Sequence, residues 1–199
     1  MAAPGVADTQ DRAAAGPDAL FGLDAGESAA FAEAFEALAR PLGLDGRAII
    51  DALARGETLA QALNLPAGVA DLLYGRAHSL FGAGRADRAE PLFRALCVID
   101  APTADHWIGY GLCLRARHAD GEAEIAFATA AALRPAWAIP QFHAAQLALA
   151  QERWPVAAEH LAAFHRVTGP DVPPAMLREA QRQSRALALR AGPRQDASP

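Results

Sequence analysis

The feature that most constrains the fold is a pattern that returns every thirty-four residues between Val69 and about Pro170. Two series of small residues and one series of large residues recur in this register: Ala77, Gly111 and Ala145; Ala89, Ala123 and Ala157; and Phe93, Phe127 and Leu161. A period of this length predicts helix–turn–helix units that stack side by side. The small residues are expected where two helices touch, and the large residues are expected to fill the space between successive units.

This period, with these residue types, is the signature of tetratricopeptide repeats (TPR). The sequence therefore predicts an all-α fold, a TPR superhelix of three repeats with N-terminal helices and a C-terminal capping helix. The three repeats occupy 67–170, with boundaries at 69–103, 103–137 and 137–170. An open stack needs such a capping helix because its last repeat would otherwise expose an apolar flank.

The segments outside the repeats divide into four regions. Residues 1–26 are rich in Ala, Gly, Pro and Asp and predict a disordered arm, and residues 192–199 predict a disordered tail. Residues 27–66 predict short helices, the first of which begins at Ser28 as its N-cap. Residues 171–191 predict the capping helix.

The N-terminal helices carry more apolar residues than short helices can bury alone. Four of them are the candidates for a dimerisation surface: Phe31, Phe35, Ile49 and Ile50. The same residues could instead cap the first repeat, and the two interpretations are compatible.

Composition excludes several classes of function. The net charge is −5, all 18 basic residues are arginine, and no arginine cluster predicts nucleic-acid binding. No apolar run approaches a membrane span, and no secretion signal is recognisable, so a cytoplasmic protein is expected. The two cysteines, Cys97 and Cys113, have no metal-ligand spacing and are expected to be buried thiols. No catalytic motif, metal site or cofactor is predicted.

The remaining candidate for function is the concave surface formed by the first helix of each repeat. Its register predicts nine groove-facing residues, most of them apolar: Tyr74, His78, Phe81, Ile108, Leu112, Arg115, Phe142, Gln146 and Leu149. The aromatic residues could be core, but the register assigns the core of the first repeat to Leu73, Ala77 and Leu80. An apolar concavity implies an apolar partner segment.

Several segments resemble one known family, the type III secretion translocator chaperones of the SycD/LcrH class. The segment from Leu96 to Asp100, the Gly109-Tyr110-Gly111 segment with Cys113, and Phe142-His143-Ala144-Ala145 are similar to characteristic segments of that family. The resemblance covers about residues 45–170. The sequence departs from the family at His78, where an aromatic residue is frequent, and at Glu152, where the turn residue is usually glycine.

The resemblance implies a chaperone without catalytic activity that is often a homodimer. Its clients would be the hydrophobic, pore-forming translocators, held by a short extended segment of PxLxxP type, with Tyr74 and Phe81 as anchors. Two alternatives stay open: a generic TPR adaptor for protein–protein interaction, and a chaperone that also binds a transcriptional regulator of secretion genes.

Overall fold

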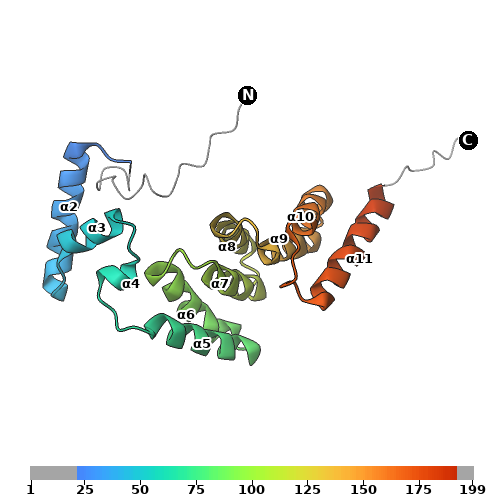
Figure 1. The fold of residues 1–199 in the computed structure, drawn as a ribbon, viewed down its shortest axis with the longest axis horizontal. Coiled ribbons are helices and arrows are strands. Elements are labelled where there is room, and N and C mark those ends of the chain that lie inside the picture. Colours follow the sequence, from blue (N-terminus) through green and yellow to red (C-terminus); the bar gives the residue numbers. More distant parts are fainter. Residues whose placement is uncertain (1–21, 192–199) are drawn as a thin grey trace, which may run out of the picture. The chain divides into compact units, whose positions relative to one another are not determined.

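The computed structural model describes residues 22–191, which are helical and contain no strand (Figure 1). The all-α prediction is therefore confirmed. The predicted tail lies outside the described residues, as does the predicted arm up to residue 21. The described residues divide into two compact units: those up to Leu72 with Val98–Ala101, and Leu73–Cys97 with those from Pro102 onward.

The first unit contains α2 (Ala25–Ala39), the 3-10 helix η2 (Arg40–Leu42), α3 (Gly46–Ala54) and α4 (Leu59–Ala62). Helix α2 begins earlier than the sequence indicated. Its N-cap is Asp24, whose side chain accepts from the backbone N–H of Glu27, while the Glu27 carboxylate accepts from Asp24. This reciprocal pair is a capping box. The prediction of Ser28 as N-cap was wrong, since Ser28 is buried within the helix.

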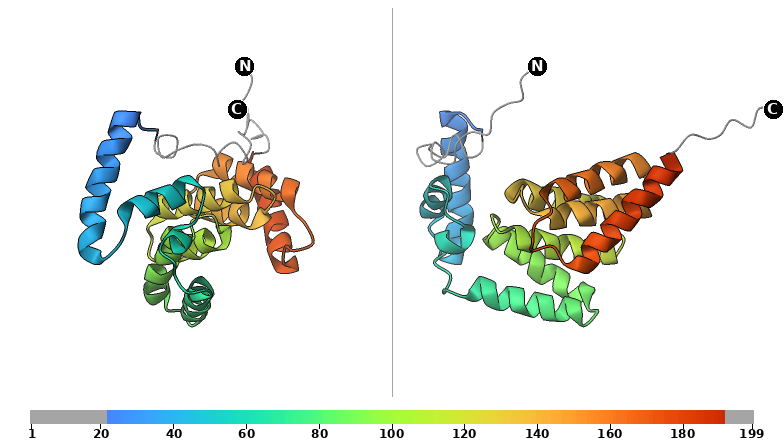
Figure 2. Two further views of the ribbon diagram at one scale, coloured as in Figure 1. Left: turned by 60° about the vertical axis from the view of Figure 1, so that its left-hand side comes forward. Right: turned by 45° about the vertical axis from the view of Figure 1, so that its right-hand side comes forward.

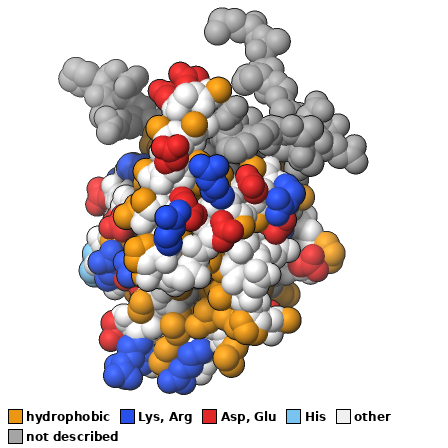
Figure 3. All heavy atoms as spheres, turned by 90° about the vertical axis from the view of Figure 1, so that its left-hand side faces the viewer, with side chains coloured by type: hydrophobic (Ala, Val, Ile, Leu, Met, Phe, Trp, Pro, Cys, Tyr) orange, Lys and Arg blue, Asp and Glu red, His pale blue; other side chains and the backbone are white. Residues whose placement is uncertain are grey.

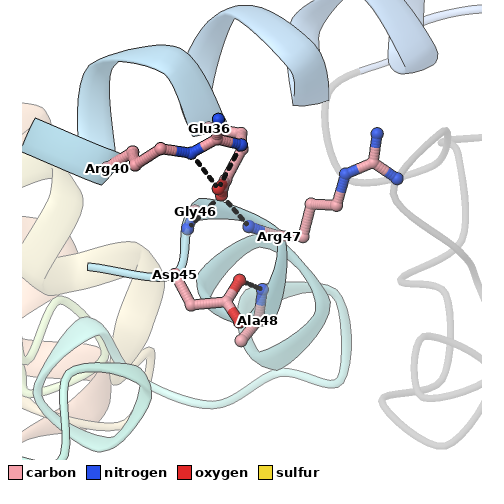
Figure 4. Close-up of polar contacts among 6 residues, drawn as sticks. All are labelled: Glu36, Arg40, Asp45, Gly46, Arg47 and Ala48. Atoms are coloured by element: carbon pink, nitrogen blue, oxygen red, sulfur yellow. Dashed lines mark hydrogen bonds and ion pairs between the residues drawn. The ribbon is translucent and has the colours of Figure 1, made fainter. Parts of the chain in front are cut away.

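Helices α2 and α3 are joined by one carboxylate (Figure 4). Glu36 of α2 accepts hydrogen bonds from the backbone N–H of Gly46 at 2.7 Å and of Arg47 at 3.4 Å, at the start of α3. Arg40 binds the other carboxylate oxygen at 3.2 Å. An anion at a helix N-terminus satisfies N–H groups that have no partner inside the helix. A Cβ at Gly46 would lie 2.8 Å from the Glu36 Cα, so only glycine permits this approach.

The second unit is a succession of antiparallel helices. Helix α5 (Val69–Gly82) begins in the first unit and continues into the second, where it precedes α6 (Ala86–Ile99), α7 (Ala104–Ala116), α8 (Asp120–Leu133), α9 (Ala138–Ala150), α10 (Trp154–Val167) and α11 (Pro174–Ala191). Figures 1 and 2 show α7 beside α8 and α9 beside α10 as hairpins. Ala77, Gly111 and Ala145, which the period assigned to helix contacts, are all buried.

Two glycines of α7 each receive a phenylalanine ring. A Cβ at Gly109 would lie 2.2 Å from the ring of Phe93 in α6, and a Cβ at Gly111 would lie 2.5 Å from the ring of Phe127 in α8. Phe127 is completely buried, and its ring also stacks on His143 of α9, with ring centroids 5.6 Å apart. The ring of one repeat is thus held between that repeat and the next.

Polar pairs about thirty residues apart also join successive repeats. Asp120 accepts from Gln151 at 3.1 Å, and Glu124 accepts two bonds from Arg153 at 3.2 and 2.9 Å, whereas Asp105 accepts from Arg134 at 2.6 Å within the second repeat. The Glu124 pair is bidentate, the most directional arrangement open to an arginine and a carboxylate. The pairs of Asp120 and Glu124 therefore fix the register of the third repeat on the second.

The turns inside the three repeats share one left-handed residue. Gly84, His118 and Glu152 lie thirty-four residues apart and have φ angles of 74°, 63° and 57°. In each turn the next residue donates its N–H to a carbonyl five residues earlier, from Arg85 to Leu80 in the first. This is a helix C-terminal arrangement that favours glycine. The second and third repeats therefore hold a conformation that is unfavourable for their side chains.

Replacing these residues by glycine is expected to stabilise the protein. Glu152→Gly and His118→Gly should each raise the free energy of unfolding by about 0.5–1 kcal/mol, because a left-handed non-glycine residue costs about 1–2 kcal/mol and the entropy of glycine cancels part of the gain. Gly84→Ala should lower it by about 1 kcal/mol. Its Cβ would meet no atom within 4 Å, so the change tests backbone conformation alone. Urea denaturation followed by circular dichroism measures all three, and a Gly84→Ala variant as stable as wild type would contradict the argument.

Candidate peptide-binding surface

The nine predicted groove residues lie on α5, α7 and α9, the first helices of the three repeats. His78 is exposed, and seven are half-buried: Tyr74, Phe81, Leu112, Arg115, Phe142, Gln146 and Leu149. Ile108 is only 8% exposed and belongs to the core around Phe127 and Leu147. Ile108 therefore offers little surface to a partner, because the periodic pattern gives a residue's direction but not its depth. That it faces the groove stays a prediction.

The aromatic residues of this surface are anchored in the core by their inner edges. Tyr74 packs edge-on against Phe93 with ring centroids 6.0 Å apart, and it also contacts His106 at 5.7 Å. Phe142 lies 5.8 Å from Phe164 of α10. The sequence left groove and core open as alternatives for such residues. The half-burial of Tyr74 and Phe142 places one part of each ring in the core and leaves another part exposed.

Charge on this surface is sparse. Arg115 is half-buried, and burial lowers the pKa of its guanidinium, while Asp120 raises it. Gln146 is held by a 2.8 Å hydrogen bond from its amide to Gln183 of α11. Burial also lowers the pKa of His143 to about 4, helped by the positive charge of Arg115, so His143 is neutral at pH 7. The surface therefore offers apolar side chains with one cation.

The cysteines are buried free thiols, as the sequence indicated. Burial raises the pKa of Cys97 and of Cys113 to about 12, with a smaller contribution from Glu90 for Cys113. Neither is a reactive thiolate at neutral pH. Within residues 22–191 no group of three or more His, Cys, Asp or Glu side chains is placed to hold a metal ion. No helix among those described has the length and apolar character needed to cross a bilayer.

The four predicted dimerisation residues separate into two groups. Ile49 and Ile50 are 4% and 3% exposed, so they are core residues of the first unit and could support a self-association surface only from beneath it. Phe31 is 37% exposed, and Phe35, half-buried, stacks on it at 6.1 Å. Figure 3 looks onto the side of the molecule where α2 is drawn, and exposed hydrophobic side chains are visible there among acidic and basic ones.

A cavity of about 730 Å³ between α10 and α11 was not predicted from the sequence. None of the nine groove residues lines it. Helix α11 was expected only to cover the last repeat, and it does cover part of it, through Ala180, Leu177 and Met176. A comparison of α10 with α8 at the thirty-four-residue offset could have revealed the uncovered face.

Known proteins share this arrangement of helices. SycD of Yersinia enterocolitica, solved with a peptide of the translocator YopD, matches 63% of this chain and 97% of its own length with a TM-score of 0.60 at 21% identity. A type III secretion complex of Aeromonas hydrophila matches 70% of this chain and 93% of its own length with a TM-score of 0.66 at 23% identity. The chain has the fold of the translocator chaperones.

A curated relative is similar in sequence to part of the chain. SicA, a chaperone protein of Salmonella typhimurium, is 38% identical over 61 residues, which are 31% of this chain and 37% of SicA. The chain thus spans little more than a third of the length of the curated relatives it matches. No family model matches the sequence.

Proposed function

We propose that this protein is a cytoplasmic, non-enzymatic chaperone of a type III secretion system that keeps the pore-forming translocators soluble. In this proposal an extended apolar segment of the client lies on the surface formed by α5, α7 and α9. The observation that carries it is the row of half-buried apolar side chains on that surface, on a fold shared with SycD bound to a YopD peptide and with PcrH bound to the chaperone-binding region of PopD.

The chemistry of the surface fits such a client. A translocator has apolar segments that would aggregate in water, and an apolar groove removes them from water without requiring them to fold. Each well-buried anchor side chain contributes on the order of 1.5–3 kcal/mol before the cost of ordering the peptide. Phe81, Leu112 and Phe142 present such area on three successive repeats.

The same proposal assigns a role to each region. Residues 67–170 form the client-binding repeats, 171–191 cap the last repeat, and 27–66 support self-association. The adaptor alternative predicts folded partners and a charged contact surface instead, so ionic strength distinguishes the two.

Peptide binding is expected to weaken at least tenfold in Phe81→Ala and in Phe142→Ala, because each removes an apolar anchor; tenfold corresponds to about 1.4 kcal/mol. The measurement is a fluorescence-polarisation titration with a labelled peptide containing Pro-x-Leu-x-x-Pro, at 0.05 and 0.5 M salt. Phe142 also packs on Phe164, so the thermal stability of that variant is measured alongside.

The matched control is Ile125→Ala on α8, a second helix of a repeat, whose side chain is 67% exposed. Its affinity should equal that of wild type. Equal affinities for both phenylalanine variants and wild type would exclude this surface as the client site. A steep loss of affinity at high salt would favour the adaptor, because the proposed surface carries only one cation.

A further inference from the structure

The cavity between α10 and α11 is an open, largely apolar slot. Its wall on α10 is formed by Ala158, Leu161 and Ala162, and its wall on α11 by Leu187 and Ala188. Two contacts between the helices bound it. The Arg190 guanidinium lies over the Trp154 ring, 4.1 Å from its centroid, and His165 Nε2 lies 3.2 Å from the Ser184 hydroxyl. These contacts link the two helices on either side of the slot.

The repeat register identifies what shape this slot accepts. Ala158, Leu161, Ala162 and His165 of α10 follow Glu124, Phe127, Ala128 and Ala131 of α8 by thirty-four residues. On α8 that face lines a cavity of only about 90 Å³, because α9 and His160 of α10 lie across it. Helix α11 follows α10 in the chain as α9 follows α8, and among the described residues no helix follows α11 to cover this face as α10 covers that of α8 (Figure 2). The slot therefore has the form of the site for a helix.

The charge of α11 indicates which helices fit. Helix α11 carries one acidic residue, Glu179, against four arginines: Arg178, Arg182, Arg185 and Arg190. A helix that enters this slot should have an apolar stripe and acidic side chains, since like charges beside α11 would repel it.

Helix α2 has this character. Its 15 residues include Glu27, Glu33 and Glu36 and no basic residue. Its apolar stripe is Phe31, Phe35 and Leu38, spaced to lie on one face, and Leu38 is 71% exposed. The length of α2 matches the 14 residues of α10 that it would lie against.

We propose that α2 of one copy of this protein enters the α10–α11 slot of a second copy. When each copy inserts its α2 into the other, the two contacts are equivalent and the assembly closes as a dimer. This proposal is independent of client binding, because none of the groove residues lines the slot. It differs from a dimer in which two α2 helices pack on each other, since it requires residues from both ends of the chain.

Two variants separate the halves of the contact. Leu38→Arg places a positive charge on the apolar stripe of the inserted helix. The double variant Ala158→Glu with Ala162→Glu places acids in the slot of an otherwise unchanged protein. All three side chains are exposed, so neither variant should affect folding. In sedimentation equilibrium, each variant should raise the dimer dissociation constant at least tenfold. The matched controls Ala37→Arg on α2 and Ala132→Glu on α8, both at exposed alanines, should dimerise as wild type does.

Mixing the two variants is the decisive measurement. The Leu38→Arg protein keeps an intact slot and the slot variant keeps an intact α2, so a mixture should form mixed dimers, with one good contact, at concentrations where each variant alone is monomeric. A fluorescent label on the slot variant reports this association. A wild-type monomer at micromolar concentrations, an unchanged dimer of the slot variant, or a mixture that stays monomeric would each overturn the proposal.

Discussion

Gly111→Leu is expected to lower the free energy of unfolding by about 3 kcal/mol, the upper part of the range for overpacked cores. A Cβ at this position would lie 2.5 Å from the Phe127 ring, well inside van der Waals contact. The ring has little room to move away, because it is completely buried and also packs on His143. The urea midpoint, followed by circular dichroism, should therefore fall sharply.

The third repeat supplies a way to repair the clash. It has Ala145 and Leu161 where the second repeat has Gly111 and Phe127. Gly111→Ala alone should destabilise, and adding Phe127→Leu should recover part of the loss, because the smaller side chain makes room for the new methyl group. A coupling free energy of about 0.5–3 kcal/mol is expected from residues in such contact.

Gly75→Ala is the matched control. Gly75 precedes Gly109 by one repeat length, but a Cβ there would meet no atom within 4 Å, so alanine should be tolerated or slightly stabilising. If Gly111→Ala and Gly75→Ala change the free energy of unfolding equally, contact with a phenylalanine ring is not the reason that α7 has glycine at these positions.

Acid is expected to destabilise the protein through His143. Burial lowers the pKa of this side chain from 6.5 to about 4 in the folded state, and its Nδ1 is buried without a hydrogen-bond partner among the described residues. Between pH 6.5 and 4 the unfolded chain therefore binds more protons than the folded chain, so stability falls as the pH falls through this window. The contribution of His143 to the loss is about 2 kcal/mol at pH 5, relative to pH 7.

Comparison with two variants isolates this contribution. His143→Phe keeps a ring to stack on Phe127, and His143→Gln keeps a polar group, but neither titrates between pH 4 and 7. Urea midpoints measured from pH 7 to pH 5 should fall less in both variants than in wild type. Parallel curves for wild type and both variants would show that His143 does not control the acid response.

The thirty-four-residue period was sufficient to predict the fold because it records direct contacts. Ala77 and Ala145 are completely buried, and Phe127 sits on Gly111 where the register required a large residue beside a small one. Asp45, which precedes α3, accepts from the backbone N–H of Ala48 at 2.9 Å, as is typical of an aspartate before a helix.

Depth and fit within the helix stack were not predictable to the same degree. Ile49, Ile50 and Ile108 were identified by spacing, but their exposure depends on the neighbours that cover them, which spacing does not specify. The seat of Phe93 on Gly109 was missed for a similar reason. A glycine within a helix does not reveal which ring fills the space that it leaves.

The seating of Phe93 and Phe127 has a consequence for how the second unit comes apart. Each ring packs against its own hairpin and against the hairpin that follows. Unfolding of one hairpin therefore removes a packing partner from the ring of the preceding hairpin. Fraying from the C-terminal end is therefore expected to spread toward α6 instead of stopping at a turn. Amide hydrogens of α6, α8 and α10 should then exchange with a common opening free energy, as in a single cooperative foldon.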